Sequence, residues 1–261
     1  MKLFACMCNQ PQRLLAALAP VRPVLLAQPP VSRWGMGYIQ GGDVLLVRTP
    51  KGSEAPVDLA SPLDEIRSDC AIAQAVDADG FSGTDNTPPF RFRRWLFALT
   101  GTAALEGTAL RLLEHIPEYL RRNLKGRTPS ELIFHVFLAM LHDEGNIDDP
   151  NLPPAAQRRA LSATLKLVQA EIARAGKPEL ELGNVALTNG RSMVLAHQSE
   201  PLRLRRLTVA GERGERDDSF RGVLLVSGGD GDPKDGFEDV PPQTAVLISR
   251  ELQVSFADLN P

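Results

Sequence analysis

The sequence contains few of the residues that bind metals or form covalent cross-links. Its 261 residues include three cysteines, four histidines and two tryptophans. An odd number of cysteines does not make a disulfide framework, so we expect reduced thiols, with Cys6 and Cys8 on opposite faces of one strand. The histidines form neither an HExxH motif nor a pair at zinc-finger spacing with the cysteines. The sequence therefore predicts neither a metal site nor another cofactor.

The chain also lacks a strong charge of one sign and a long apolar run. Its formal net charge is −3 and its pI is about 5.9, and without a basic field we expect no nucleic-acid partner. No run approaches the roughly 20 apolar residues that span a bilayer. The first residues do not follow the order of a signal peptide. We therefore expect a cytoplasmic protein that does not enter a membrane.

Short apolar segments bounded by turn residues predict β-strands in both the first half and the last third of the chain. These segments are residues 2–8, 33–39, 44–48, 70–76, 94–101, 182–188, 193–197, 204–209, 223–226 and 245–248. Gly41 and Gly42 separate the second segment from the third, which is typical of a β-hairpin.

Helices are predicted between these two groups of strands, in addition to a short helix at 11–18. The sequence TPSE at 128–131 provides an N-cap threonine, a proline at the first helical position and a glutamate three residues after the cap. An apolar stretch follows at 132–141, and a second amphipathic pattern occupies 161–172. Strands, helices and strands in this order predict an α+β layered domain.

Several motifs of this chain occur in the same order in a known family. They are KLFA at 2–5, WGMGY at 34–38, DNTPPF at 85–90, RWLF at 94–97, GRTPSE at 126–131, NVALTNG at 184–190 and FEDVP at 237–241. In order and spacing they resemble the class II (N-terminal nucleophile) glutamine amidotransferases, in particular the stand-alone branch. The resemblance covers nearly the whole chain. It implies a single amidotransferase domain over residues 1–261, folded as a four-layer αββα sandwich of two stacked antiparallel sheets flanked by helices.

The resemblance also implies an ancestral reaction, the hydrolysis of the glutamine side-chain amide with release of ammonia. In such enzymes an N-terminal cysteine attacks the amide carbon, and its own α-amine acts as the base. An asparagine and a glycine N–H stabilise the oxyanion, and one such donor lowers the barrier by roughly 3 kcal/mol. An arginine and an aspartate hold the α-carboxylate and the α-amine of the substrate.

The position of the nucleophile holds Met1 in this sequence. Matching KLFA to the start of the family places Met1 where the cysteine stands, and a thioether cannot attack as a thiolate does. Lys2 is too bulky for the usual removal of an initiator methionine, so we expect Met1 to be retained. Cys6 and Cys8 lie several residues further along. The nucleophile is therefore expected to be absent.

The positions that bind the substrate and the oxyanion are also altered. Gln74 and Val76 stand where the family strand has its histidine and its carboxylate-binding arginine. Thr100 replaces the oxyanion asparagine, and only the following Gly101 is retained. Pro129 replaces the aspartate that meets the substrate amine. We therefore expect no catalytic residue at these positions.

These replacements favour a catalytically inactive relative, a pseudoenzyme that acts by binding as a scaffold or a regulatory subunit. The expected partner is a protein, such as an active homologue or a synthase, and self-association is left open. The cleft should be less polar than in an active enzyme and lack a charged clamp. Two enzymatic alternatives remain: removal of residues 1–5 exposes Cys6 as a nucleophile, or a hydrolase uses Cys70 or another residue. A further alternative is that the chain is an α+β protein of another role, outside this family.

Overall fold

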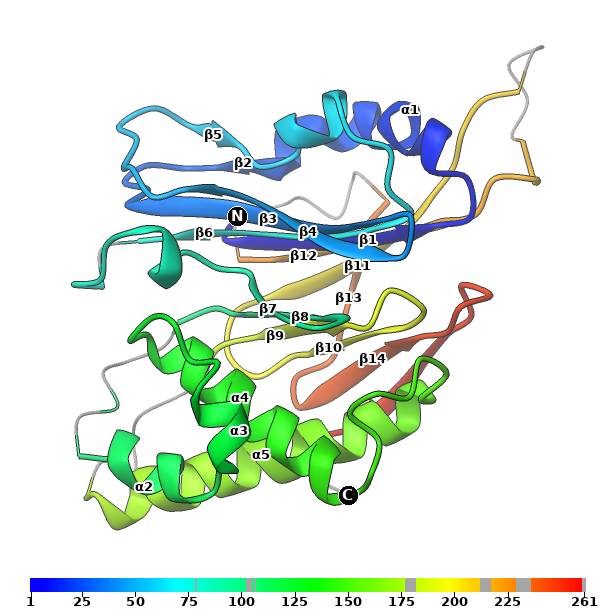
Figure 1. Cartoon of the computed structure of the whole chain (residues 1–261). Helices are drawn as coiled ribbons and strands as arrows, with labels where there is room; N and C mark the ends of the chain where they lie inside the picture. Colours follow the sequence, from blue (N-terminus) through cyan, green and yellow to red (C-terminus); the bar gives the residue numbers. More distant parts are fainter. Residues whose placement is uncertain are drawn as a thin grey trace.

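The protein consists of four layers, with two antiparallel β-sheets packed face to face and helices on the outer face of each sheet (Figure 1). The computed structural model describes residues 1–77, 79–101, 105, 107–176, 182–211, 217–228 and 236–259. The predicted α+β class and αββα sandwich are confirmed. No helix in these described ranges is both long and apolar enough to cross a membrane.

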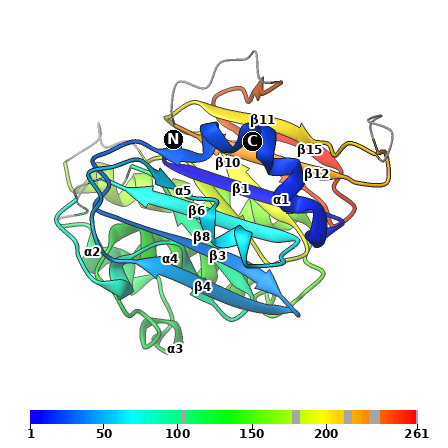
Figure 2. The same cartoon turned by 90° about the horizontal axis from the view of Figure 1, so that it is seen from above.

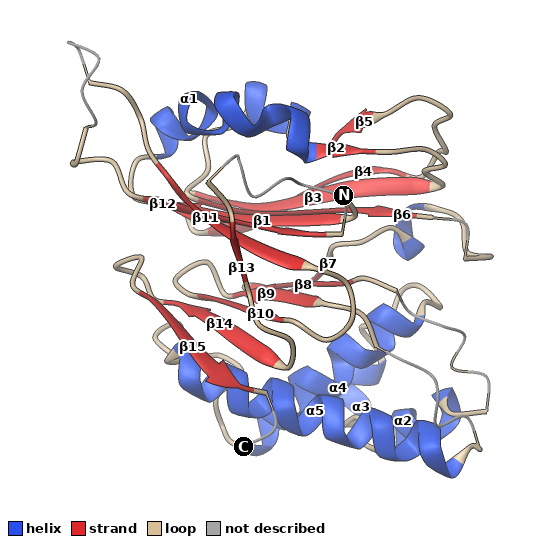
Figure 3. Ribbon diagram, turned by 180° about the vertical axis from the view of Figure 1, so that it is seen from behind, coloured by secondary structure: helices blue, strands red, loops and turns tan. Residues whose placement is uncertain are grey.

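The first sheet contains seven strands in the order β13-β11-β12-β1-β6-β3-β4 (Figure 3). They are β1 (Leu3–Cys8), β3 (Arg33–Gln40), β4 (Asp43–Thr49), β6 (Cys70–Val76), β11 (Leu202–Leu207), β12 (Gly222–Ser227) and β13 (Glu238–Asp239). Strand β1 pairs with β12 on one side and β6 on the other, so that Leu3 lies opposite both Ser227 and Gln74. The first residues of the chain are therefore in the middle of this sheet.

The second sheet contains six strands in the order β15-β14-β10-β9-β8-β7. They are β7 (Phe90–Phe92), β8 (Trp95–Leu99), β9 (Val185–Thr188), β10 (Met193–Ala196), β14 (Thr244–Ile248) and β15 (Val254–Asp258). A further small sheet pairs β2 (Leu26–Ala27) with β5 (Val57–Asp58). Every predicted strand is present. Strands β2, β5, β7, β13 and β15 were not predicted, because they are short or largely exposed and carry little apolar pattern.

The helices form the two outer layers (Figures 1 and 2). The first sheet is covered by η1 (Pro11–Arg13), α1 (Leu14–Leu18) and η2 (Ala19–Leu25), and the second by α2 (Ala109–Glu114), α3 (Glu118–Arg121), α4 (Pro129–Asp143) and α5 (Pro154–Arg174). Two short 3-10 turns, η3 (Ser61–Asp64) and η4 (Thr84–Asn86), lie in connections. Helices α2 and α3, of six and four residues, are too short to show a periodic pattern and were not predicted.

Helix α4 begins at the predicted N-cap. Thr128 Oγ1 accepts a hydrogen bond from the Glu131 N–H at 3.3 Å. The Glu131 carboxylate accepts from the N–H groups of Lys125 and Gly126 at 3.0 and 2.7 Å. The glutamate of the TPSE motif therefore fixes the loop before the helix as well as the helix start.

Three apolar clusters hold the layers together, because successive residues of a strand face opposite sides. On β1, Leu3 and Met7 lie between the two sheets, whereas Phe4, Cys6 and Cys8 pack beneath the first helical layer. The expectation that Cys6 and Cys8 face opposite sides is wrong, because residues two positions apart on a strand share a face.

The glycines of the WGMGY motif allow the two sheets to approach each other. A Cβ atom on Gly37 would lie 2.5 Å from the side chain of Leu96 on β8. A Cβ atom on Gly35 would lie 2.5 Å from the carbonyl oxygen of Pro88. Both distances are shorter than a van der Waals contact, so a side chain at either position would push the second sheet or the loop before it away.

His135 on α4 is expected to make stability depend on pH. Its side chain is buried, with Nδ1 donating to the carbonyl oxygen of Glu131 at 2.9 Å and Nε2 lacking a hydrogen-bond partner. Burial lowers the pKa of His135, so the ring stays neutral in the folded state but takes up a proton in the unfolded state below about pH 6.5. The free energy of unfolding should therefore fall as the pH decreases below about 6.5, by up to about 1.4 kcal/mol per pH unit from this group.

Urea titrations on either side of that pH measure the effect. His135→Gln should reduce the difference between the two unfolding free energies, and His142→Gln, at an exposed position of the same helix, serves as the control. Equal pH dependence in the wild type and in His135→Gln would contradict the assignment.

Candidate functional site

A cavity of about 170 Å³, here called the intersheet pocket, lies where the ends of β6 and β8 meet the first turn of α4. Its lining includes residues of both sheets, so the pocket lies between them. The residues that line it are Lys2, Arg33, Gln74, Ala75, Val76, Asp77, Asp79, Asn86, Pro88, Phe90, Leu99, Thr100, Gly101, Thr128 and Ser130.

The structure brings most of the residues singled out from the sequence to this pocket. Those that line it are Gln74, Val76, Thr100 and Gly101. Pro129 is buried at the start of α4, between two lining residues, but does not itself line the pocket. Met1 packs against the apolar cluster beneath the first helical layer. The first residue of the chain to line the pocket is therefore Lys2, whereas Met1, at the position matched to the nucleophile, does not line it.

Gln74 connects the two sheets. It lies on the face of β6 that is turned toward the second sheet, and its Nε2 donates to the carbonyl oxygen of Leu99 at 2.7 Å. Because that carbonyl can only accept, the orientation of the amide is defined by this bond. The Oε1 atom has no hydrogen-bond partner. Gln74 thus acts here as a neutral bridge between β6 and β8.

The Thr100 hydroxyl is engaged in the wall of the pocket. Its Oγ1 accepts from the Asn184 N–H at 3.0 Å, and the Thr100 N–H donates to the Asn184 carbonyl at 2.9 Å. The Asn184 side chain continues the network by donating to Ser227 Oγ at 2.9 Å and to the Glu200 carbonyl at 2.6 Å. Thr100 therefore ties the segment after β8 to the segment before β9.

Lys2 carries a fixed positive charge into the pocket wall. Its Nζ lies 2.7 Å from Glu200 Oε1 and 3.3 Å from Asp77 Oδ2. The hydrogen bond to Glu200 raises the pKa of Lys2, so the group is an ammonium at neutral pH and is not available as a nucleophile. With Arg33 and Asp79 also in the wall, the pocket is more charged than the sequence predicted.

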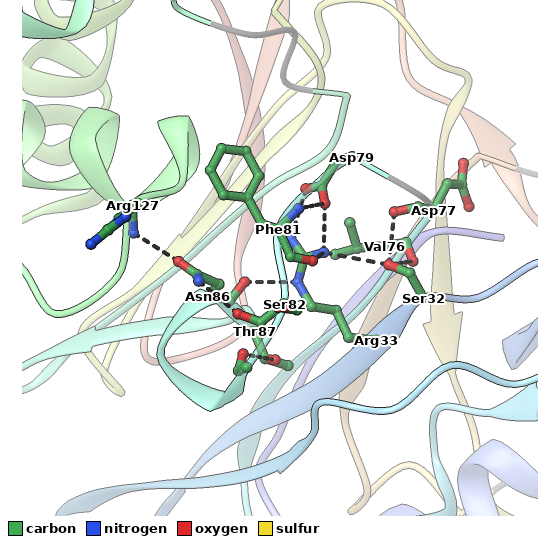
Figure 4. A network of polar contacts seen from close by, with 11 residues as sticks. Ser32, Arg33, Val76, Asp77, Asp79, Phe81, Ser82, Asn86, Thr87 and Arg127 are labelled. Carbon is green, nitrogen blue, oxygen red and sulfur yellow. Dashed lines mark hydrogen bonds and ion pairs between the residues drawn. The ribbon is translucent and has the colours of Figure 1, made fainter.

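Arg33 is the centre of a polar network where β3 begins and β6 ends (Figure 4). Its side chain is 2% exposed. The Nη1 and Nη2 atoms donate to the two carboxylate oxygens of Asp79, both at 2.6 Å. The Nε atom donates to the Asn86 carbonyl at 2.8 Å, and Nη1 also donates to the Phe81 carbonyl at 3.0 Å. One guanidinium therefore contacts three separate residues of the loop between β6 and β7.

Neither Arg33 nor Asp79 was predicted as a site residue from the sequence. One signal was present, because Arg33 shares its face of the strand with Gly35 and Gly37, the face that meets the second sheet. The register also places it opposite Val76. Burial is the largest single influence on the Asp79 carboxyl and opposes its ionisation, but the hydrogen bonds from Arg33 and from backbone N–H groups, together with the Arg33 charge, lower its pKa.

Two of the family-like motifs meet beside the pocket. Asn86, from DNTPPF, accepts from the Arg127 N–H at its Oδ1 at 2.7 Å and donates from Nδ2 to the Ser82 carbonyl at 2.7 Å (Figure 4). A Cβ atom on Gly126, from GRTPSE, would lie 2.5 Å from the Asp85 carbonyl and 2.6 Å from Asn86 Oδ1. These motif residues hold the loop against the start of α4.

The cysteines lie away from the pocket wall and are expected to be unreactive. Cys6, Cys8 and Cys70 are all buried, and none of them lines the pocket. Burial raises the pKa values of Cys8 and Cys70 to about 12, and it also raises the pKa of Cys6 well above its usual value. The thiolate required for attack is therefore scarce at neutral pH.

A thiol reagent should distinguish buried from accessible cysteines. The native protein is expected to react with less than one equivalent of a disulfide reagent at neutral pH, and the urea-unfolded protein with all three cysteines. Rapid modification of one thiol in the native protein would contradict the burial of all three cysteines.

Within the described part of the chain, no three histidine, cysteine, aspartate or glutamate side chains gather as a metal site would require. The charged groups of the pocket instead pair with one another. The arrangement offers hydrogen-bond donors, acceptors and paired charges for binding a ligand.

Comparison with known proteins identifies the fold. Neither a family model nor a curated protein matches the chain. The glutamine aminotransferase class-II domain protein from Silicibacter pomeroyi has a similar structure, with a TM-score of 0.60 and 17% identity over 99% of this chain and 100% of the other. The predicted glutamine amidotransferase from Pseudomonas aeruginosa has a TM-score of 0.56 and 15% identity over 97% and 99%. At this identity, the chain shares the fold of these amidotransferase proteins along nearly its whole length.

Proposed function

We propose that this protein is a catalytically inactive relative of the class II glutamine amidotransferases that acts by binding, as a scaffold or regulatory subunit. Residues 1–261 serve as one domain in this role, and the cytoplasm is its location. The partner is a protein such as an active homologue or a synthase. The intersheet pocket no longer performs amide hydrolysis.

One observation carries the proposal: the first residue in the pocket wall is a lysine whose ammonium is held by two carboxylates. Lys2 contacts Glu200 and Asp77, and the hydrogen bond to Glu200 raises its pKa. A charged amine has no lone pair with which to attack an amide or to accept a proton. The described residues that line the pocket include neither a cysteine nor a histidine to take over this role.

The geometry weighs against the processed form in which Cys6 becomes the nucleophile. Cys6 lies in the middle of β1, paired with Leu224 of β12 and Ala71 of β6. Removal of residues 1–5 would take half of this central strand out of the sheet. The Cys6 side chain also packs beneath the first helical layer, on the opposite face from the pocket.

A hydrolase based on Cys70 is also disfavoured. Cys70 is fully buried between the sheets, where its Sγ lies 3.4 Å from Thr188 Oγ1. Burial raises its pKa to about 12, and no basic group contacts the thiol among the described residues to counter that effect. The substrate would have no path to this sulfur without separation of the sheets.

Incubation with L-glutamine tests the proposal. Purified protein is expected to release ammonia no faster than a buffer control, while an active class II amidotransferase assayed in parallel does so readily. Intact-mass measurement of the same sample should show Met1 retained. Ammonia release proportional to the protein concentration would overturn the proposal, and a mass lacking residues 1–5 would favour Cys6 as its source.

The binding role requires a separate measurement. Addition of the protein to an active homologue from the same organism is expected to yield a complex on size-exclusion chromatography and to change the rate of ammonia release by that homologue. A change of rate with complex formation supports a regulatory subunit, and complex formation alone supports a scaffold.

A further inference from the structure

Arg33 has the geometry of a carboxylate-binding group in the wall of the intersheet pocket. Its buried guanidinium places Nη1 and Nη2 each 2.6 Å from one oxygen of the same carboxylate, that of Asp79. Its Nε is directed elsewhere, to the Asn86 carbonyl. A fork of two parallel hydrogen bonds is how arginine recognises a planar carboxylate. The protein thus contains a formed carboxylate subsite that is filled by one of its own side chains.

Asp79, the side chain that fills this subsite, is more exposed to solvent than Arg33. The Asp79 side chain is 22% exposed, against 2% for Arg33. Apart from Arg33, the Asp79 carboxylate accepts a local hydrogen bond from the Phe81 N–H at 3.1 Å. An external carboxylate that takes its place would keep Arg33 paired, and Asp79 would move further into water. Such an exchange conserves the number of buried ion pairs and so avoids the penalty of an unpaired buried charge.

The remaining pocket wall restricts the kind of ligand. Asp77 also lines the pocket, with its side chain 56% exposed, and its charge disfavours a dianion such as phosphate. Lys2 pairs with both Asp77 and Glu200, so one ammonium faces two carboxylates and leaves no excess positive charge for a dianion. Val76, opposite Arg33 in the sheet, and Phe90 provide apolar surface in the pocket lining. These features fit a singly charged carboxylate on a short aliphatic chain.

We propose that Arg33 is the subsite for the carboxylate of a small aliphatic monocarboxylate, and that Asp79 occupies it until such a ligand displaces this side chain. The inference goes beyond the proposed function, because it assigns a ligand class to the intersheet pocket. Because Asp79 fills the subsite, the apparent affinity for the ligand is the intrinsic affinity multiplied by the fraction of molecules in which the subsite is open. Wild-type protein should therefore bind the ligand weakly, and loss of the Asp79 charge should strengthen binding.

Titration with propionate tests this directly, with propionamide as the uncharged ligand of the same shape. Asp79→Asn is expected to bind propionate at least about tenfold more tightly than the wild type, because the competing carboxylate is gone. Neither protein should bind propionamide. The double variant Arg33→Gln with Asp79→Asn removes both members of the ion pair and should not bind propionate.

Asp64→Asn is the matched control. It breaks a second bidentate pair, in which Arg22 contacts the Asp64 oxygens at 2.7 and 2.9 Å, at a position that does not line the pocket. Propionate affinity should equal that of the wild type in this variant. The inference is overturned if wild type and Asp79→Asn bind propionate equally, if neither binds it, or if the double variant retains binding.

Hydrogen exchange of the wild type provides a test that does not depend on the folding of any variant. Propionate should increase exchange at the Phe81 amide, since release of Asp79 removes the acceptor of that N–H, and propionamide should not. Unchanged exchange overturns the inference. Failure here would leave the absence of ammonia release untouched, whereas ammonia release would contradict the proposed function whatever the propionate result.

Discussion

Replacement of Arg33 by alanine is expected to lower the free energy of unfolding by about 3–5 kcal/mol, the usual loss when one member of a buried ion pair is removed. The substitution leaves Asp79 without its guanidinium and removes the donors to the Asn86 and Phe81 carbonyls. The loop between β6 and β7 then loses the side-chain contacts that Arg33 makes with it. Urea denaturation followed by far-UV circular dichroism measures the loss.

Arg22→Ala is the comparison that isolates burial. Arg22 contacts two carboxylates, those of Asp58 and Asp64, but its side chain is 24% exposed. Water can solvate the carboxylates that it leaves behind, so the expected loss is about 1 kcal/mol. If Arg22→Ala and Arg33→Ala destabilised the protein equally, the importance assigned to burial of Arg33 would be wrong.

Gly183→Ala is expected to reduce stability by more than about 3 kcal/mol, beyond the usual range for an overpacked site. A Cβ atom at this position would lie 1.7 Å from the carbonyl oxygen of Thr100 and 2.3 Å from its carbonyl carbon. Both are backbone atoms, so no change of side-chain rotamer relieves the overlap. The segment must move, and the paired hydrogen bonds between Thr100 and Asn184 would be lost with it.

Gly52→Ala provides the control for the effect of glycine replacement itself. The nearest atom to a Cβ at Gly52 is the Val31 carbonyl oxygen at 3.1 Å, a contact that a small shift relieves. We expect a loss of about 1 kcal/mol or less, at the low end for overpacking. Thermal unfolding of the two variants compares them. Similar melting temperatures would show that the pocket wall adapts more easily than its geometry implies.

Much of the fold could be predicted because its signals are local. The apolar segments at 70–76 and 193–197 became strands β6 and β10, and the TPSE motif begins α4. Helices α2 and α3 and the edge strand β15 were missed, because few residues in them repeat an apolar pattern. The prediction that Cys6 and Cys8 face opposite sides of β1 was wrong, because residues two positions apart on a strand share a face.

The site was predicted only in part. Gln74, Val76, Thr100 and Gly101 were placed by their resemblance to family motifs, and the structure brings these four positions to one pocket. The charged residues of that pocket were not found. Arg33 precedes a motif without belonging to it, and nothing in its immediate sequence indicates a partner.

By itself, the sequence determined where the longer buried strands and helix α4 form, since apolar alternation and capping depend on a few neighbouring residues. Only the tertiary structure decided the charge pairing of the pocket. Lys2 meets Glu200 across 198 positions of the chain, and Arg33 meets Asp79 across 46. These encounters follow from the placement of β1 between β6 and β12 and of β3 beside β6, because sheet order brings together residues that sequence separation keeps apart.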